Sequence, residues 1–468
     1  MLSNVRPTGE QLLIINDYRP GAVVVRGAAG SGKTTTAVLR LRHVTNVWRN
    51  AAERADSDRP VRVLVLTFNR TLRGYVEELV RKQVRSDGIY LRLDTFARWA
   101  KQLAGNPELV STAEHERHIA QLATPLGLPR DFIVGEADYV TGRYPPGQLD
   151  GYLDRRYGEI YRRHGRGASP QMTQARRRRL VSEVVIPYAA WKRQRGLVDW
   201  NDIAVRAAAA DADPYDVVVV DEAQDFSANM VRAVLAQLSD EHSCTFVLDA
   251  AQRVYPHGFT WKEVGLDLRP NRDVFTLRQN HRNTRRIAAF ARPLVDGLPL
   301  EDDGTLPDFD ACEIDGELPV VVRGRFAAQM DWIVRYLRQL PTDESVGILH
   351  PKGGGWLGYV RSCLDDAGIA YVDLQRRRDW PQGPPEVGLS TLHSVKGLEF
   401  DHVVITGLED GHMPHGDEED DTQFAIHRRL LAMAIGRARR TVCLTYKPET
   451  EPRVIQLLDP ATYRLEDR

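Results

Sequence analysis

A glycine-rich segment near the start of the chain has the residue types and spacing of a phosphate-binding loop. It has the pattern G-x-x-x-x-G-K-T and reads Gly27-Ala28-Ala29-Gly30-Ser31-Gly32-Lys33-Thr34. An apolar run precedes it at 22–25, and a segment of helical periodicity follows it at 35–44. Backbone N–H groups surround phosphate oxygens where strand, loop and helix follow in this order. The pattern therefore predicts a nucleoside triphosphate site in which Lys33 contacts the β- and γ-phosphates and Thr34 binds Mg²⁺.

Two adjacent carboxylates supply the other half of a phosphate-hydrolysing site. Asp221 and Glu222 follow four valines at 217–220, which have the character of a buried strand. We expect Asp221 to hold Mg²⁺ through its water shell and Glu222 to act as general base toward an attacking water. Two acids after an apolar run are a weak signal by themselves, because turns at strand ends favour aspartate. Together with the glycine-rich loop they predict hydrolysis of a nucleoside triphosphate.

Short apolar runs indicate the elements that must position these groups. They recur at 22–25, 61–66, 217–220, 245–248, 346–349 and 403–406, and longer segments of helical period separate them. Such alternation is typical of buried parallel strands in an α/β fold. There are enough strands for two sheets, the first from 22 to about 277 and the second from about 278 onward. A strand-poor segment from about 95 to 198 interrupts the first.

Composition excludes several other classes of protein. The chain has 468 residues, with 63 Lys and Arg against 64 Asp and Glu, 42% hydrophobic residues and 27% charged residues. These values are ordinary for a folded globular protein and argue against disorder. The four cysteines are too far apart in sequence for the usual zinc or iron–sulfur spacing. No leader pattern and no apolar run of roughly 18 residues is present, so we expect a cytoplasmic protein without membrane contact.

The strand-poor segment has its own charge balance. Between residues 152 and 195 there are 12 Lys and Arg against 3 Asp and Glu. We therefore expect an inserted helical subdomain with one basic face. Its arginine run at 176–179 could follow duplex phosphates, although a solvated helix face explains the run almost as well.

Eight segments, including the one that holds the acidic pair, follow one another in the order of the motifs of a known family. They are 8–11, 66–69, 95–97, 221–224, 249–255, 280–283, 391–400 and 428–439, and the run Thr391-Leu392-His393-Ser394-Val395-Lys396-Gly397-Leu398-Glu399-Phe400 is the most diagnostic. They are similar to the ordered motifs of superfamily 1 helicases of the UvrD/Rep type. The resemblance implies two RecA-like P-loop NTPase domains that use ATP and Mg²⁺. It also implies closure of the two domains around the nucleotide.

The resemblance implies a role for individual residues. The nucleotide would contact Gln11, Gly27, Ala28, Gly30, Ser31, Gly32, Lys33, Thr34, Thr35, His281 and Glu399. Catalysis would use Glu222, with Gln252 as γ-phosphate sensor and with Arg282 and Arg437 as cationic fingers. The nucleic-acid strand would contact Phe68, Asn69, Thr95, Phe96, Tyr255, Trp261, Thr391 and His393. For the aromatic members of this set, ordinary core packing is the alternative. His281 stands where the family usually has tyrosine, which puts the grip on adenine in doubt.

The motif positions predict a domain plan. Residues 1–94 and 198–277 would form the first RecA-like domain (1A), residues 95–197 the basic helical insertion (1B), and residues 278–468 the second RecA-like domain (2A). Arg282 and Thr391 are 109 positions apart, so the family's large helical insert, 2B, cannot fit between them. The 31 residues after Arg437 leave no space for an appended nuclease. We expect a minimal form of the family.

Two functions remain open at this point. The first is an ATP-dependent translocase or helicase on single-stranded DNA with 3′→5′ polarity, the polarity being implied by the resemblance. The second is a nucleic-acid-gated ATPase switch that recruits or licenses a partner nuclease or accessory protein in DNA repair or antiphage defence. The motifs do not separate DNA from RNA, because aromatic side chains stack on the bases of either.

Overall fold

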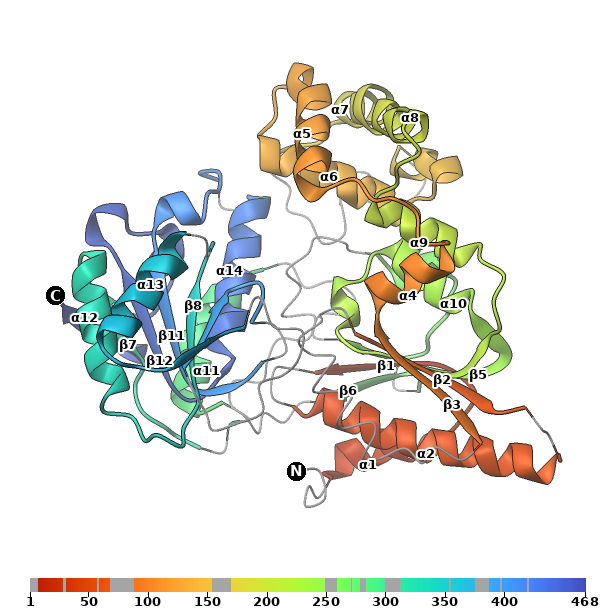
Figure 1. Cartoon of the computed structure of the whole chain (residues 1–468), viewed down its shortest axis with the longest axis horizontal. Helices are drawn as coiled ribbons and strands as arrows, with labels where there is room; N and C mark the ends of the chain where they lie inside the picture. Colours follow the sequence, from red (N-terminus) through yellow and green to blue (C-terminus); the bar gives the residue numbers. More distant parts are fainter. Residues whose placement is uncertain are drawn as a thin grey trace.

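The structure is a computed structural model, and Figure 1 shows two lobes, each built on a parallel sheet, with a helical insertion above the N-terminal lobe. It describes residues 7–27, 31–56, 59–67, 88–153, 170–248, 259–270, 272–277, 283–298, 312, 314–352, 355–374, 387–395, 398–418 and 421–468. The predicted fold class, α/β with two parallel sheets and an inserted helical segment, is confirmed.

The N-terminal sheet has the strand order β3-β2-β4-β5-β1-β6, and every pair is parallel. Its strands are β1 (Gly21–Gly27), β2 (Val61–Thr67), β3 (Ile89–Thr95), β4 (Tyr215–Val220), β5 (Leu238–Leu248) and β6 (Val274–Leu277). The apolar runs found in the sequence form β1, β2, β4 and β5. All six residues of β4 are buried, which explains why this strand was visible as a continuous valine run.

Helices cover both faces of this sheet. One face packs against α2 (Lys33–Arg54), through Val38, Leu41 and Val44. The other packs against α4 (Phe96–Leu103), α9 (Trp200–Ala208) and α10 (Ala228–Leu235). The short helix α1 (Gly9–Ile15) lies against α2 and β6. The helix α4 falls inside the range 95–197 that we expected for the insertion, but its Trp99 is fully buried in the core of the N-terminal lobe.

The insertion has a hydrophobic core of its own. It consists of α5 (Thr112–Ala123), α6 (Arg130–Arg143), α7 (Gln174–Arg179), a π-helical turn (Leu180–Val185) and α8 (Ile186–Gln194). The chain enters and leaves it side by side: Leu109 and Val198 form a parallel bridge, and the Val110 N–H donates to the Val198 carbonyl. The two connections are therefore joined at the base of the insertion.

The C-terminal sheet has the order β13-β7-β12-β11-β8-β10-β9 and is also parallel. Its strands are β7 (Val320–Arg323), β8 (Val346–His350), β9 (Tyr371–Asp373), β10 (Val387–Thr391), β11 (Phe400–Leu408), β12 (Ala438–Tyr446) and β13 (Arg464–Asp467). Its helices are α11 (Arg285–Val295), α12 (Phe326–Leu337), α13 (Gly355–Asp366), α14 (Thr422–Ile435) and α15 (Arg453–Gln456).

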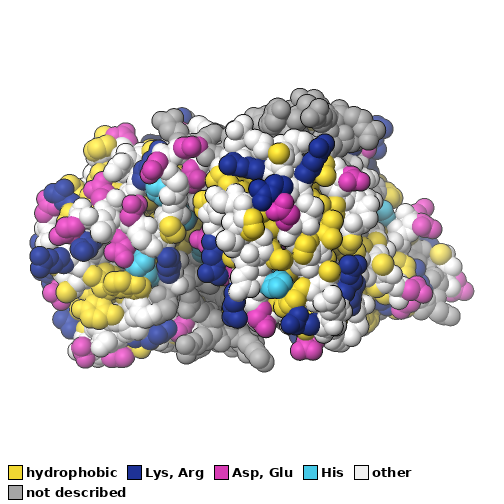
Figure 2. All heavy atoms as spheres, turned by 90° about the horizontal axis from the view of Figure 1, so that it is seen from above, with side chains coloured by type: hydrophobic (Ala, Val, Ile, Leu, Met, Phe, Trp, Pro, Cys, Tyr) yellow, Lys and Arg dark blue, Asp and Glu magenta, His cyan; other side chains and the backbone are white. Residues whose placement is uncertain are grey.

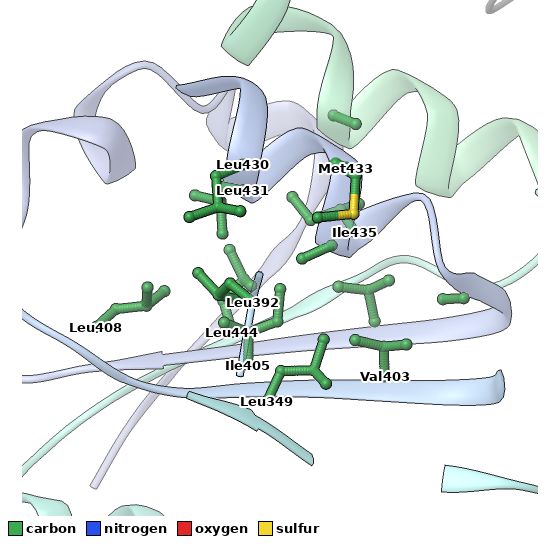
Figure 3. Packing of buried hydrophobic residues seen from close by; sticks show 14 of the residues in the cluster. Leu349, Leu392, Val403, Ile405, Leu408, Leu430, Leu431, Met433, Ile435 and Leu444 are labelled. Carbon is green, nitrogen blue, oxygen red and sulfur yellow. The ribbon is translucent and has the colours of Figure 1, made fainter. Parts of the chain in front are cut away.

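One helix of this lobe leads into the candidate site. Figure 3 shows Leu430, Leu431, Met433 and Ile435 of α14 lying over Ile405 and Leu444 of the sheet. This packing orients the end of α14, where Gly436 and Arg437 follow directly.

The described elements between Asn283 and Thr391 all belong to the C-terminal lobe. They are α11, β7, α12, β8, α13, β9 and β10, and the four strands are members of its sheet. Within the described residues, no helix is both long enough and apolar enough to cross a membrane.

Candidate functional site

The phosphate-binding loop joins the end of β1 to the start of α2. Gly27 is the last residue of β1 and Lys33 the first of α2, and the Lys33 Nζ donates to the Gly27 carbonyl at 2.7 Å. Gly32 has a φ of +77°, and a Cβ there would lie 2.6 Å from Gln11 Nε2. The left-handed backbone favours glycine at Gly32, and a side chain there would also displace the Gln11 amide. Ala28 and Gly30 lie outside the described residues.

Gln11 connects the first helix to this loop. Its side-chain carbonyl accepts from the Thr8 N–H at 3.0 Å, and its amide donates to the Ser31 carbonyl at 3.3 Å. The first contact belongs to a capping box at the start of α1, which holds the Gln11 side chain in place. Gln11 is therefore held beside the loop by both ends of its side-chain amide.

Asp221 and Thr34 meet between the end of β4 and the start of α2. The Thr34 hydroxyl donates to Asp221 Oδ2 at 3.1 Å, and the Glu222 N–H donates to Asp221 Oδ1 at 3.1 Å. Asp221 is only 3% exposed. Burial, followed by the neighbouring charge of Glu222, raises the pKa of Asp221 to about 7. The fold thus places a carboxylate where its negative charge is costly unless a cation is present.

The oxygen atoms of Thr34 and Asp221 fit a magnesium ion. Mg²⁺ prefers hard oxygen ligands and is usually held by one or two protein groups, with water and phosphate completing its shell. Among the described residues, no group of three or more His, Cys, Asp or Glu side chains is arranged to hold a metal ion. This pair would therefore hold the ion together with the phosphates of a nucleotide.

Glu222 is the second residue after β4 and has a left-handed backbone conformation, with φ +57°. Such a φ is uncommon for a residue other than glycine and is often found at functional sites. The Gln224 amide donates to the Glu222 carboxylate. Gln224 was not among the predicted site residues, although its place within the motif at 221–224 was the available signal.

Arg437, the predicted finger of the C-terminal lobe, lies in the two-residue connection of Gly436 and Arg437 between α14 and β12. It is 3% exposed, and its Nε donates to the Met433 sulfur at 3.3 Å. Glu399, predicted to contact the nucleotide, accepts from the Arg439 guanidinium at 2.9 Å in the same lobe. Arg282, His281 and Gln252 lie outside the described residues.

Two predicted strand contacts are wrong, because their rings have no face free for a base. Phe96 is 2% exposed and packs against Trp99 and edge-on against Phe226. Trp261, in a 3₁₀ turn at Trp261–Val264, is 8% exposed and lies between Phe246 and Phe259. Both rings belong to the core of the N-terminal lobe, which is the alternative that the sequence left open.

The remaining strand candidates differ in exposure. The hydroxyl of Thr95 caps α4 by accepting from the Arg98 N–H, and this threonine is buried. Thr391 ends β10 and bonds to Ser394. His393, two residues later, is exposed and remains available to a ligand. Phe68, Asn69 and Tyr255 lie outside the described residues.

The arginine run on α7 is only partly available to a ligand. Arg177 is buried and donates to the Met172 and Tyr152 carbonyls, while Arg179 pairs with Glu183 at 2.8 Å. Figure 2, which looks onto the insertion, shows basic side chains gathered on it with an acidic one among them. The run is therefore not the uniformly free basic face that its sequence indicated.

Comparisons with known proteins give matches in both lobes. The AAA domain family matches residues 11–257, and the UvrD-like helicase C-terminal domain family matches residues 366–449. The ATP-dependent DNA helicase Rep of Salmonella typhimurium is 36% identical over 73 residues, which are 16% of this chain and 11% of that protein. A probable DNA helicase of Mycoplasma pneumoniae is 21% identical over 459 residues, covering 91% of this chain and 80% of that protein.

One solved structure is similar to part of the chain. The C-terminal domain of a possible DNA helicase from Lactobacillus plantarum WCFS1 is 21% identical to the chain and superimposes with a TM-score of 0.30. The match covers 40% of this chain and 98% of that domain.

Proposed function

Since the chain belongs to the AAA domain family and carries a UvrD-like helicase C-terminal domain, as UvrD/Rep-like helicases do, we propose that it is an ATP-driven motor that moves on single-stranded DNA with 3′→5′ polarity. The observation that carries this proposal is the 3.1 Å contact between Thr34 and Asp221, beside the Lys33 loop and with Glu222 directly after. This set of groups is what hydrolysis of a nucleoside triphosphate requires.

Each residue of the site has a distinct part in the proposed hydrolysis. Lys33 neutralises phosphate oxygens, and Gln11 recognises the adenine next to the loop. Thr34 and Asp221 would hold Mg²⁺, which supplies positive charge to the phosphates when bound. Glu222 accepts a proton from the attacking water, and the Gln224 amide orients its carboxylate.

In the proposed mechanism the C-terminal lobe supplies the two cationic fingers. Charge on the equatorial oxygens of the transferred phosphoryl group is stabilised by Arg282 and Arg437. Lys33 and Arg437 belong to different lobes, so in this proposal the lobes approach each other for both to contact one nucleotide. Binding of ATP then closes the lobes and hydrolysis releases them, which moves the strand. The proposed domains remain 1–94 and 198–277 for 1A, 95–197 for 1B and 278–468 for 2A, except that α4 (Phe96–Leu103) packs in the core of 1A.

Steady-state ATP hydrolysis tests the proposal. The purified chain is assayed with and without single-stranded DNA, single-stranded RNA and duplex DNA, and Glu222→Gln serves as the inactive control. We expect single-stranded DNA to stimulate hydrolysis at least tenfold and Glu222→Gln to lower it by 10² or more, in the range of lost general-base catalysis, about 10²–10⁴. A rate of ATP hydrolysis that is the same with and without each nucleic acid would overturn the motor proposal.

A second function is favoured by one observation. All described elements between Asn283 and Thr391 belong to the C-terminal lobe, so the described part of this region contains no additional helical domain. The chain would then act as a nucleic-acid-gated switch that recruits a partner nuclease. Robust unwinding of a duplex by the purified chain alone would contradict this alternative, whereas strand-stimulated hydrolysis without unwinding would support it.

A further inference from the structure

Asn283 is a buried polar residue that has no role in the hydrolysis proposed above. It is 6% exposed and directly follows Arg282 in the chain. The next residue, Thr284, is the N-cap of α11, and its hydroxyl accepts from the Ile287 N–H at 3.3 Å. Asn283 therefore lies at a well-defined helix start, between a proposed finger and a capped helix.

The Asn283 side chain crosses to another segment of the lobe. Its Nδ2 donates to the Gly436 carbonyl at 3.1 Å and to the Ala438 carbonyl at 2.6 Å. These two carbonyls flank Arg437 on either side. A side-chain amide has two N–H donors, so one group can bond to both carbonyls at once.

The backbone of Arg437 itself is also held. Its N–H donates to the Ala434 carbonyl at 3.1 Å, and its carbonyl accepts from the Phe400 N–H at 3.0 Å. Those two bonds connect Arg437 to α14 and to β11. Asn283 joins both flanking carbonyls, and it does so from the start of α11.

The position of these bonds matters because the connection is so short. Only Gly436 and Arg437 lie between α14 and β12, so rotation of either flanking peptide would swing the Arg437 side chain. A cationic group stabilises a developing charge only when its geometry is set before the reaction. A buried amide that bonds both neighbours of the arginine can set that geometry.

We propose that Asn283 is a positioning residue for Arg437, fixing the turn from which this arginine reaches the phosphates. The inference rests on the proposed function, because Arg437 has this role only if the chain hydrolyses ATP between its lobes.

The test compares Asn283→Asp with a matched control, Asn229→Asp. Aspartate has the shape of asparagine but no N–H donors. Asn229 is 2% exposed and donates to the Thr141 carbonyl at 2.9 Å, where the insertion meets the N-terminal lobe, away from Arg437. Amide hydrogen exchange is measured on peptides covering 433–440, together with kcat, KM for ATP and affinity for single-stranded DNA. Asn283→Ser, which is smaller and keeps one donor, replaces Asn283→Asp if that variant does not fold.

We expect Asn283→Asp to speed exchange at 433–440 at least fivefold and to lower kcat at least tenfold, with KM and strand affinity within twofold of the wild type. Asn229→Asp should change neither exchange at 433–440 nor kcat by more than twofold. Unchanged exchange in Asn283→Asp overturns the positioning role, and so does an equal loss of kcat in both variants. A wild-type chain that hydrolyses no ATP would instead overturn the proposed function, and the exchange comparison would still decide whether Asn283 holds this turn.

Discussion

At the level of single residues, Asp221 and Glu222 both cost the folded state free energy, Asp221 through its buried charge and Glu222 through its backbone conformation. Burial and the charge of Glu222 raise the pKa of Asp221 to about 7. Glu222 has a φ of +57°, and a residue other than glycine in this region stores about 1–3 kcal/mol of strain. Such costs persist where the surrounding structure enforces them, and they commonly mark a site that binds charged ligands.

Replacing Asp221 with asparagine should therefore stabilise the folded chain while it removes ATP hydrolysis. The folded-state pKa lies above the unfolded value of 3.8, so between pH 4 and 7 the folded state binds more protons than the unfolded state. Wild-type stability is lost as pH rises through this window. The loss amounts to at most about 4 kcal/mol, at 1.36 kcal/mol for each unit of pKa.

Denaturant unfolding at several pH values, without nucleotide or divalent cation, measures this effect. We expect Asp221→Asn to exceed the wild type in free energy of unfolding at pH 8 and to approach it near pH 4. A variant less stable than the wild type at pH 8 would show that the hydrogen bonds from Thr34 and Glu222 outweigh the cost of burying the charge.

Phe96 yields a second prediction at this scale. Because its ring is buried against Trp99 and Phe226, Phe96→Leu should lower the free energy of unfolding by about 1–2 kcal/mol. Its affinity for single-stranded DNA, measured by fluorescence anisotropy on the folded protein, should stay within twofold of the wild type. A large loss of affinity at unchanged stability would restore Phe96 as a strand contact.

Among the elements, the junction of α8 and α9 holds an unusual ionic cluster. Lys192, at 4% exposure, places its ammonium between the carboxylates of Asp199 and Asp202. Asp199 and Asp202 also form the capping box of α9. Burial and the charge of Asp199 raise the pKa of Asp202. The lysine thus connects the last helix of the insertion to the first turn of a helix in the N-terminal core.

Lys192→Met should lower the free energy of unfolding by about 3–5 kcal/mol at pH 7.5, because it leaves the buried carboxylate of Asp199 and the partly exposed carboxylate of Asp202 without their cation. The loss should shrink at pH 5, where protonation relieves the repulsion between them. Lys262→Met, at an exposed position, is the control and should change stability by no more than about 0.5 kcal/mol. An equal effect of Lys192→Met at both pH values would contradict the ionic explanation.

On the scale of the whole molecule, the proposed motor needs its lobes to move. Arg437 is 3% exposed within its own lobe, so contact with a nucleotide bound at Lys33 requires both lobe closure and a change of its side chain. We expect fluorescence energy transfer between labels at Asp240→Cys and Asp331→Cys to change when a non-hydrolysable ATP analogue binds.

The native cysteines do not compete for the labels once one of them is replaced. Cys244, Cys312 and Cys443 are buried, and only the partly exposed Cys363 needs replacement by serine. Lys33→Ala should abolish the change in transfer by preventing nucleotide binding. If calorimetry shows that the analogue binds to the labelled wild type while the transfer stays constant, lobe closure does not occur.

Local pattern was sufficient to predict much of the fold. The strands β1, β2, β4, β5, β8 and β11 appear in the sequence as apolar runs because both their faces are covered. The strands β3, β6, β7, β9, β10, β12 and β13 were not among the predicted apolar runs. In β12 the exposed Arg439 and Arg440 interrupt the pattern near its start, although its later residues are buried. The strand β13 is an edge strand of mostly charged and exposed residues. Apolar periodicity cannot reveal a strand whose side chains face water.

The sequence by itself determined the α/β class with two parallel sheets, the loop at Lys33 and the strand-end carboxylates, because each depends on neighbours within a few positions. Only the tertiary structure decided that Phe96 and Trp261 are core rings rather than strand contacts, since burial depends on helices distant in sequence. It alone brought Thr34 to Asp221 and Asn283 to the carbonyls beside Arg437, contacts that span 187 and about 155 positions. No local pattern encodes contacts over such separations, because they exist only once packing has closed the chain.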